Sequence, residues 1–302
     1  MLTRRTFLQT SSASALVTPF GGFAARAQSG LFRFGIVADP QYAPVPPRGS
    51  RFYAHSLWKL SEAVDDFNTQ DVEFTVTLGD IIDRHWESYA HILPVYDRLD
   101  APNVFVLGNH DYEVARDYLE SVERRTGLDR AYYDFTGGGY RFVVLDGNEI
   151  SLFANERGSE NHALAEERLA ALEAAGADNA KRWNGGMSDA QFAWAEDVFA
   201  DARSKGERVI VMGHYPVFPK DMHNMWDDNR LVDLLTAQDN AVLYLNGHNH
   251  AGNYAQAGSV HFLNVKGMVE TPDTTAYAVA EVHDDRIEIL GRGIEESRTL
   301  RF

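Results

Sequence analysis

The sequence predicts a single α/β domain, and two observations support this fold class. Apolar runs with little polar alternation, such as Leu31–Ala38 and Val72–Leu78, are typical of strands buried on both faces of a sheet. Segments with helical periodicity separate such runs, and the first repeats apolar residues at spacings of three, four and three over residues 57–67. The 302 residues are 44% apolar, which allows one large core, and we find neither an internal repeat nor an interdomain linker.

The first half of the chain continues this alternation. Three prolines make Tyr42–Ser50 a loop, and His85–Leu99 is expected to be a helix that breaks or bends at its proline. Asn103–Leu107 is expected to be the third strand. Tyr132–Phe135 and Arg141–Leu145 flank a glycine-rich turn, which predicts a β-hairpin. The turn lacks the Gly-Lys-Ser/Thr ending of a phosphate-binding P-loop.

The second half begins with a segment rich in Ala and Glu, at about residues 151–184, which predicts an insertion of one or two exposed helices. Ser188 and Gln191 form a capping box at the start of a further helix. The remaining expected elements are a helix at Leu231–Gln238 and strands at Arg208–Met212, Ala241–Leu245, Val260–Val265, Ala276–Val282 and Arg286–Leu290.

Composition limits the chemistry that the chain can perform. The formal net charge of −16 argues against nucleic-acid binding, which normally needs a basic face, so no nucleic-acid partner is expected. An active site in so acidic a protein would need cations to attract a phosphate-bearing substrate. The chain has no cysteine, which excludes disulfides, thiolate catalysis and thiolate metal ligands. Any metal must therefore bind to His, Asp, Glu, Asn or Gln.

The N-terminus has the features of an export signal. A twin-arginine pattern at Thr3–Leu8 precedes the small and apolar stretch Ser11–Phe23 and an A-x-A cleavage site at Ala25–Ala27. We predict a signal over residues 1–27 for the twin-arginine export machinery, a domain over residues 28–302, and a periplasmic or secreted protein. The alternatives are a general secretory signal and a disordered basic tail. No run of 18 apolar residues occurs outside the first thirty, so no stable membrane insertion is expected.

Clusters of polar side chains follow five of the expected strands. In chain order they are Asp39 with Gln41, Asp80 with Asp83, Asn109 with His110, His214 alone, and His248 with His250. Ligands in α/β proteins bind at the carboxyl ends of the strands, so these side chains are expected to meet there. Oxygen and imidazole ligands suit Mn, Fe or Zn better than Ca or Mg alone. A single pair can arise by chance, whereas five clusters at strand ends favour a common site.

These clusters resemble the motifs of a known superfamily. They read Asp39-x-Gln41, Gly79-Asp80-x-x-Asp83, Gly108-Asn109-His110-Asp111, Gly213-His214 and Gly247-His248-x-His250. In this order the sequence resembles the calcineurin-like metallophosphoesterases from roughly Phe34 to the C-terminus. The resemblance implies a metallophosphoesterase domain with a four-layer αββα sandwich of two mixed sheets, and a two-metal centre at the strand ends.

The resemblance also implies a role for each motif residue. One divalent metal would be held by Asp39, Gln41, Asp80 and His250, and the other by Asp80, Asn109, His214 and His248. Asp80 would thus bridge the two metals. His110 would protonate the leaving oxygen or stabilise its charge, and Asp83 would orient the imidazole of His110.

Gln41 narrows the resemblance, because most of the superfamily has His at that position. An amide oxygen is a harder ligand than imidazole, so Mn is expected in preference to Zn or Fe. Stretches around Gln41 and further along the chain are similar to the manganese-dependent ADP-ribose/CDP-alcohol diphosphatases. These stretches are Asp39–Tyr42, Arg51–Leu57, Leu78–Asp83, Trp183–Gly186, Val269–Pro272 and Gly291–Gly293. The similarity implies hydrolysis of the phosphoanhydride bond in a nucleotide-type small molecule.

Two departures affect the expected substrate contacts. Arg84 follows Asp83 where a small residue is expected, and it could contact phosphate or form a surface salt bridge. An aromatic-rich segment that helps to seat a nucleobase does not follow His110, but Tyr112 or Tyr118 could stack on a base. His55 could lie near the pocket mouth, although a His on an amphipathic helix is more often packed or solvated.

The expected function is a two-metal hydrolysis of ADP-ribose or CDP-alcohols. One alternative is a less selective exported phosphodiesterase or phosphomonoesterase that uses the same metal ligands. A second alternative is a non-catalytic scaffold with the metallophosphoesterase fold. Scaffolds of this kind usually lose ligands or the catalytic His, whereas every expected position is filled in this sequence.

Overall fold

The structure, a computed structural model, describes residues 31–302 and contains two six-stranded mixed sheets. The expected export signal at residues 1–27 lies outside the described residues. Among residues 31–302, no helix is both long and apolar enough to pass through a membrane.

The first sheet has the order β12-β11-β10-β1-β2-β3. Its strands are β1 (Phe32–Val37), β2 (Phe74–Leu78), β3 (Asn103–Val106), β10 (Ala276–Val282), β11 (Arg286–Gly293) and β12 (Arg298–Arg301). The first three strands are parallel, whereas the last three are antiparallel to their neighbours. The carboxyl ends of β1, β2 and β3 therefore share one edge of the sheet.

The second sheet has the order β4-β5-β6-β7-β9-β8. Its strands are β4 (Tyr133–Gly137), β5 (Tyr140–Val144), β6 (Arg208–Met212), β7 (Ala241–Asn246), β8 (Asn253–Ala257) and β9 (Val260–Asn264). The strands β5, β6, β7 and β9 are parallel, and β4 and β8 pair antiparallel at the two edges. The expected hairpin is confirmed as β4 and β5.

Both sheets pack against each other on one face and against helices on the other. Along β5, Phe142 and Val144 belong to the core shared with the first sheet, whereas Val143 packs into the core beneath the outer helices. Between the sheets, the ring of Phe34 stacks on Phe74 at 5.0 Å, and Phe74 meets Phe142 edge-on at 5.1 Å. Burial of both faces explains why these strands have apolar runs without alternation.

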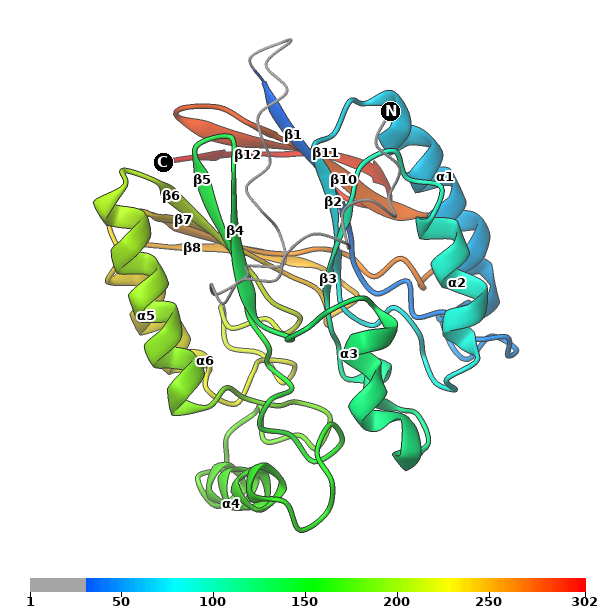
Figure 1. Ribbon diagram of the computed structural model, residues 1–302, viewed down its shortest axis with the longest axis vertical. Helices are drawn as coiled ribbons and strands as arrows, with labels where there is room; N and C mark the ends of the chain where they lie inside the picture. The colour runs from blue at the N-terminus through cyan, green and yellow to red at the C-terminus, as the bar shows by residue number, and fades with distance from the viewer. Residues whose placement is uncertain (1–30) are drawn as a thin grey trace, which may run out of the picture.

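The helices complete a four-layer αββα arrangement, as expected (Figure 1). The longer ones are α1 (Ser56–Thr69), α2 (Ser88–Tyr96), α4 (Glu160–Ala174), α5 (Asp189–Ser204) and α6 (Asp228–Thr236). The pair α1 and α2 covers the first sheet, and α5 and α6 cover the second (Figure 1). Short helical turns are η2 (Tyr53–His55), η3 (His110–Tyr112), η4 (Arg116–Ser121) and α3 (Val122–Arg125).

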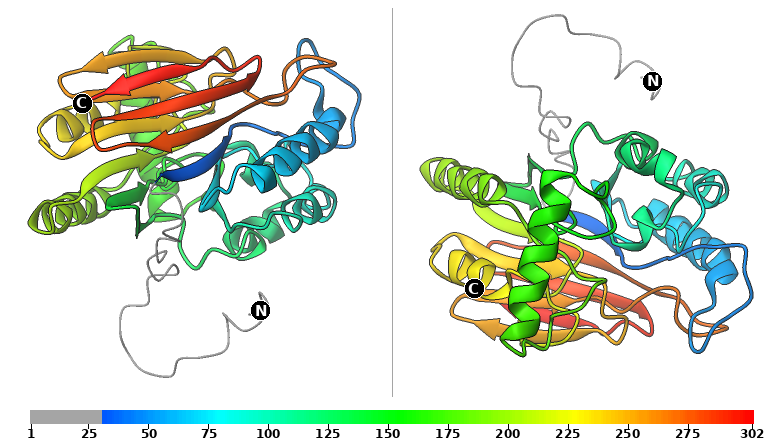
Figure 2. Two further views of the ribbon diagram at one scale, coloured as in Figure 1. Left: turned by 90° about the horizontal axis from the view of Figure 1, so that it is seen from above. Right: turned by 90° about the horizontal axis from the view of Figure 1, so that it is seen from below.

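The expected insertion contains one helix, α4, which lies beyond one end of the sheets (Figure 2). Its buried residues Ala165 and Leu169 pack with Ile150 and Trp226 in a small core of their own. Arg168 joins this helix to the main body, because its Nη1 donates to the Met187 carbonyl at 2.7 Å. The insertion is therefore joined to the main body by its own small core and by hydrogen bonds such as those of Arg168 and Asn179.

Three details differ from the expectations. The strands β8 and β12 were not expected, and both lie at sheet edges. Helix α2 begins at Ser88 and continues through its proline to Tyr96, without a break. The capping box at Ser188 is half formed, because its hydroxyl accepts from the Gln191 N–H at 3.0 Å but the Gln191 side chain bonds Asp146 and Glu149 instead.

Candidate metal centre

Two groups of metal-ligating side chains lie where the carboxyl ends of the two sheets meet. The first consists of Asp80, His214 and His248, and the second of Asp39, Asp80 and His250. Within each group, the ligand atoms lie within 4.8 Å of one another. Asp80 belongs to both groups, so its carboxylate is placed to bridge two cations.

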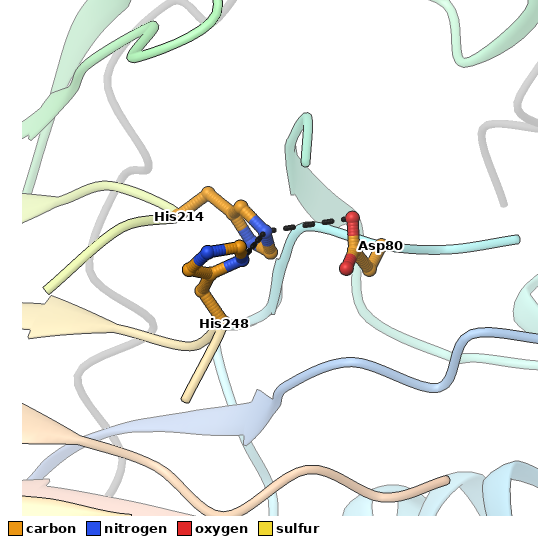
Figure 3. A group of neighbouring side chains, drawn as sticks. All are labelled: Asp80, His214 and His248. Atoms are coloured by element: carbon orange, nitrogen blue, oxygen red, sulfur yellow. Dashed lines mark hydrogen bonds and ion pairs between the residues drawn. The ribbon is translucent and has the colours of Figure 1, made fainter. Parts of the chain in front are cut away.

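The parallel strands explain why residues so far apart in sequence meet. Asp39 and Asp80 follow β1 and β2 of the first sheet, and His214 and His248 follow β6 and β7 of the second. Figure 3 shows Asp80 approaching the two imidazoles from the opposite sheet. Neither sheet could form the centre alone, so packing of the two sheets assembles it.

The ligand-bearing turns have unusual backbone geometry. The φ angles are +47° at Asp39, +44° at Gln41, +51° at Asp80 and +69° at His248. Non-glycine residues rarely adopt these left-handed values, each of which costs on the order of 1–3 kcal/mol. Such strain persists at functional sites where the surroundings hold it in place. Four strained residues in one cluster of potential ligands indicate a built site.

Glycine is required where two of these turns touch. A Cβ at Gly108 would collide with the Asp80 carboxylate and the His214 ring, and a Cβ at Gly79 would collide with the same imidazole. Gly79 also has a φ of +90°. The glycines of the Gly-Asp and Gly-Asn-His motifs therefore allow the ligand loops to approach each other closely.

The first ligand group also includes an amide. His214 Nε2 lies 3.4 Å from Asp80 Oδ1, 3.2 Å from Asn109 Oδ1 and 3.1 Å from His248 Nδ1. All four residues are at most 8% exposed. Three potential ligand atoms thus lie within 3.4 Å of His214 Nε2, and the four residues are those predicted to hold this metal.

The second ligand group has an unpaired amide beside it. His250 Nε2 lies 3.6 Å from Asp39 Oδ1, and Gln41 is fully buried. The amide oxygen and nitrogen of Gln41 have no hydrogen-bond partner among the described residues. An unsatisfied buried amide costs roughly 1–3 kcal/mol, which a bound cation would offset at the oxygen. The residues present therefore fit a metal at this position.

Each candidate histidine ligand has its second ring nitrogen engaged elsewhere. His214 Nδ1 lies 2.8 Å from the Leu78 carbonyl oxygen, and His248 Nε2 lies 3.1 Å from Asn184 Oδ1. His250 Nδ1 lies 2.7 Å from Glu270 Oε1. Metal-binding histidines usually have such a partner, which fixes the ring and the tautomer.

The protonation state of His248 also fits metal binding. Burial, together with the nearby imidazole of His214, lowers the pKa of His248 well below its usual range. Its ring is therefore neutral at neutral pH, which is the form that binds a metal.

His110 and Asp83 lie together beside this centre. His110 Nδ1 is 3.4 Å from Asp83 Oδ1 and 3.2 Å from the Asp83 carbonyl oxygen. The backbone N–H of His110 donates to Asp80 Oδ1 at 2.8 Å. Burial lowers the pKa of His110, but Asp80, Glu113 and Asp83 outweigh this effect and raise it to about 9. The nearby carboxylates thus favour the protonated form of this imidazole.

The three expected substrate-binding residues differ in their positions. Arg84 forms an ion pair with the buried carboxylate of Asp83 and has a side chain that is 38% exposed. His55 Nδ1 lies 2.8 Å from the Pro272 carbonyl oxygen. Tyr112 is 7% exposed and belongs to the core, so its ring offers little surface on which a nucleobase could stack. Tyr118 is 38% exposed, but its ring already stacks on Trp86 at 4.8 Å.

The structure also reveals supporting residues that the sequence analysis did not assign. Asn184 and Glu270 orient two of the candidate ligands, although both lie in stretches that contributed to the family resemblance. Asp111 joins the turns of Asp80 and Asn109, because its carboxylate accepts the N–H groups of Ile81 and Gly108 at 3.0 and 2.8 Å. The Asp that follows the Gly-Asn-His motif was a signal that could have identified this role.

Two further residues line the histidine side of the centre. The ring of Tyr215 lies 4.9 Å from His214 and 4.7 Å from His248, and its hydroxyl donates to Asn148 Oδ1 at 2.7 Å. The ring of His223 lies 5.6 Å from that of His248, and its Nδ1 is 2.6 Å from Asp221 Oδ1. Tyr215 directly follows His214 after β6, whereas His223 does not follow an apolar run.

Comparisons with known proteins agree with this site. The model of the calcineurin-like phosphoesterase family matches residues 32–252, which contain all five strand-end clusters. The manganese-dependent ADP-ribose/CDP-alcohol diphosphatase of Oryza sativa is 30% identical over 296 residues, or 86% of this chain and 91% of the relative. The Homo sapiens protein of the same name is 26% identical over 90% of this chain and 93% of its own length.

A solved structure shows the same architecture. The crystal structure of a dimetal phosphatase from Danio rerio matches with a TM-score of 0.81 and 26% identity, covering 90% of this chain and 99% of that chain. The similarity thus extends well beyond the motifs and includes the sheets that position them.

Proposed function

The chain belongs to the calcineurin-like phosphoesterase family, and on that basis we propose that it hydrolyses the phosphoanhydride bond of nucleoside diphosphate derivatives. The observation that carries the proposal is the pair of ligand groups that share Asp80. Two adjacent cations suit an in-line displacement at phosphorus, because they stabilise both the attacking and the leaving oxygens. The names of the relatives support ADP-ribose and CDP-alcohols as the substrate class.

We propose that the centre takes two Mn²⁺ ions. The amide oxygen of Gln41 is a harder donor than imidazole, and the relatives are named as manganese-dependent. The Gln41→His variant is therefore expected to shift the preference of the apoprotein from Mn²⁺ towards Zn²⁺, measured as the ratio of the two dissociation constants. An unchanged ratio would contradict this role for the amide.

When bound, the two ions supply positive charge that polarises the phosphoryl group and lowers the pKa of water. The protein residues supply geometry and a proton. Asp80 holds the two positions at a fixed separation, while Asp83 keeps Nδ1 of His110 engaged and leaves its Nε2 for the substrate. As the water oxygen bonds to phosphorus and loses a proton to solvent, the bridging P–O bond breaks and the leaving oxygen takes the proton from His110, which solvent then restores. The carboxylates of Asp83 and Glu113, which lie 3.4 and 3.5 Å from Nδ1 of His110, favour the protonated imidazole.

Arg84 is proposed to contact the phosphoryl group that is not attacked. Its guanidinium is tied to Asp83 and lies 6.0 Å from the centre of the Tyr53 ring, with part of the side chain exposed to solvent. A diphosphate needs a cation beyond the metals, and the chain as a whole is acidic. Replacing Arg84 with Met is expected to raise KM for ADP-ribose more than KM for an aryl phosphate, which has one phosphoryl group. Equal changes in both would argue against this contact.

A substrate panel tests the proposed function. The mature protein with Mn²⁺ should release AMP from ADP-ribose and CMP from CDP-choline, whereas AMP itself should release little phosphate. The panel also includes a cyclic nucleotide and an aryl phosphate, and the His110→Ala variant serves as the control with an intact set of metal ligands. Strong phosphate release from monoesters without AMP release from ADP-ribose would identify a less selective phosphomonoesterase.

We also propose that the protein is exported by the twin-arginine route and acts in the periplasm or outside the cell. The support is the sequence at Arg4 and Arg5, followed by the small and apolar stretch and the cleavage site that ends at Ala27. Replacing both arginines with lysine should retain the precursor in the cytoplasm, as judged by cell fractionation. The Arg26→Lys variant, which changes a basic residue outside the motif, should be exported normally. Export of the double variant would contradict the proposal.

A further inference from the structure

Lys59 is a fully buried lysine on α1, outside the set of candidate metal ligands. Lysine is rarely buried without a partner, because removing an ammonium from water costs several kcal/mol or more. A buried lysine in the helix layer therefore needs an explanation, and its hydrogen bonds provide one.

The Lys59 ammonium binds three carbonyl groups of one short loop. Its Nζ donates to the carbonyl oxygens of Met268, Glu270 and Thr271 at 2.5 to 2.9 Å. An ammonium has three donors, so this loop matches its full capacity. Four consecutive residues, 268–271, are thereby fixed to α1 through a single side chain, and we refer to them as the support loop.

The support loop contacts the second ligand group at three points. The N–H groups of Met268 and Val269 donate to the carbonyl oxygens of Ala38 and Asp39 at 2.9 and 3.0 Å. The side chain of Glu270 lies 2.7 Å from Nδ1 of His250. Two of the candidate ligands of this metal, one carboxylate and one imidazole, therefore depend on the same loop.

The imidazole rings of the first ligand group have other supports. His214 Nδ1 is engaged by the Leu78 carbonyl, and His248 Nε2 by the Asn184 side chain. Neither contact involves the support loop or α1. Asp80 is the only residue that belongs to both ligand groups. Among the described contacts, neither its backbone N–H nor its side chain forms a hydrogen bond with the support loop. Within residues 31–302, the one direct link between the two groups that involves neither Asp80 nor the support loop is the His248 backbone N–H, which donates to the Asp39 carboxylate at 3.0 to 3.1 Å.

We propose that Lys59 is a positioning residue for one of the two metal sites, the one made by Asp39, Gln41 and His250. It holds the support loop so that Glu270 keeps the His250 ring oriented with Nε2 towards the metal. This inference rests on the proposed two-metal function and assigns to Lys59 a role at one site only. A purely structural lysine would instead stabilise the fold and affect both sites equally.

The test measures Mn²⁺ binding to the apoprotein by calorimetry and by metal analysis, using the mature full-length chain. Wild-type protein should bind two ions. In the Lys59→Met variant, which keeps a similar length and removes the charge, one site should weaken by roughly 10–100-fold while the other keeps its affinity, as is typical when an outer-shell partner of a ligand is lost. Glu270→Gln should produce the same loss at one site without removing a buried cation.

The matched control is Arg141→Met, which removes a different buried cation. Arg141 is 5% exposed and pairs with Asp134, Asp201 and Glu207, all of which lie outside the two ligand groups. This variant should unfold at a lower temperature but bind two Mn²⁺ ions as the wild type does. It separates a general loss of stability from a selective loss of one metal.

Several results would overturn the proposal. The proposal is wrong if Lys59→Met weakens Mn²⁺ binding equally at both sites. It is also wrong if this variant binds Mn²⁺ at both sites as the wild type does. If Lys59→Met does not fold, Glu270→Gln decides alone, and unchanged binding of both ions then refutes the role of the support loop. The proposed function is tested separately by activity. If the wild-type protein binds two Mn²⁺ ions but hydrolyses no diphosphate, the proposed function is wrong, while the binding measurements still test the role of Lys59.

Discussion

Asp80 is the residue on which both ligand groups depend, and Asp83, three positions later, has a different environment. Asp80 belongs to the ligand group of His214 and His248 and also to that of Asp39 and His250. Asp83 instead contacts His110 and Arg84. The left-handed backbone at Gly79 and Asp80 turns the Asp80 carboxylate towards the imidazoles, while Asp83, after a short parallel pairing with Tyr42, lies against different partners.

Substitution at these two positions is therefore expected to have different effects. Asp80→Asn removes the bridging charge and should abolish both Mn²⁺ pairing and hydrolysis. Asp83→Asn should leave two ions bound and lower kcat by roughly 10–100-fold, because His110 loses its orienting carboxylate. Metal analysis and steady-state kinetics on the same samples check both. Loss of metal from Asp83→Asn would show that this carboxylate acts at the metals instead.

Metal binding should also depend on pH at the residue scale. Burial raises the pKa of Asp80, and the carboxylates of Asp39 and Glu270 outweigh burial to raise the pKa of His250 to about 9. Both groups must lose their protons to bind a cation, so protons compete with the metal. Affinity for Mn²⁺ is therefore weakest at low pH and rises as pH increases towards 9.

The affinity for Mn²⁺ is expected to rise about tenfold per pH unit for each proton that the metal displaces. Isotherms at pH 6.5, 7.5 and 8.5, in buffers with different ionisation enthalpies, measure both the affinity and the number of protons released. The His250→Gln variant cannot be protonated at that position, so its slope should be shallower. Affinity that does not change over this range would contradict proton competition.

At the scale of elements, α4 is held by a small core apart from the sheets. Leu169, which is 4% exposed, packs there with Ile150 and Trp226. Leu169→Ala should cost about 2–3 kcal/mol within this cluster. Because the cluster is separate from the two main cores, the loss should appear as local opening.

Hydrogen exchange distinguishes local from global effects. Amides of α4 should exchange faster in Leu169→Ala, while those of α1 and β1 should keep their wild-type protection. The Ala175→Gly variant, at the end of the same helix, serves as a control that leaves the cluster intact. Faster exchange throughout the sheets would show that α4 is part of the main cooperative unit.

Strands with apolar runs were predictable, but two of the four edge strands, β8 and β12, were not. β6 was expected at Arg208–Met212 and occurs there, because a strand buried on both faces needs continuous apolar residues. β8 and β12 are partly exposed and pair with one neighbour each, so backbone pairing maintains them without an apolar run. The sequence therefore predicts strands with buried apolar residues, including the edge strands β3 and β4, and misses those maintained by backbone pairing.

In the site, too, some residues could be predicted from their place in the sequence, and others could be identified only from the folded structure. Residues directly after strands could be placed together from the sequence, because parallel strands bring their carboxyl ends to one edge. Asn184 reaches His248 across 64 positions, and Lys59 reaches the support loop across about 210. Such contacts depend on how the loops pack after the sheets have formed, and no spacing in the sequence encodes them.

For the whole molecule, the metal centre joins carboxylates of the first sheet to imidazoles of the second. Asp39 and Asp80 come from the first sheet and lie buried in one cluster, where the charge of Asp39 adds to burial in raising the pKa of Asp80. Imidazoles from the second sheet complete the cluster. Bound cations should therefore stabilise the packing of the two sheets as well as the reaction.

Removing the metals should accordingly lower the unfolding temperature. With Mn²⁺ at about 100 times the dissociation constant, one site contributes about 2.7 kcal/mol, which corresponds to a Tm difference of about 5–10 °C for a protein of this size. Calorimetry before and after chelation, followed by Mn²⁺ addition, measures this difference and its reversal. Asp80→Asn should show little response to the chelator, because it lacks the bridge. A wild-type Tm that is unaffected by chelation would mean that the two sheets pack equally well without cations, and that the carboxylates in the apoprotein are neutralised by protons instead.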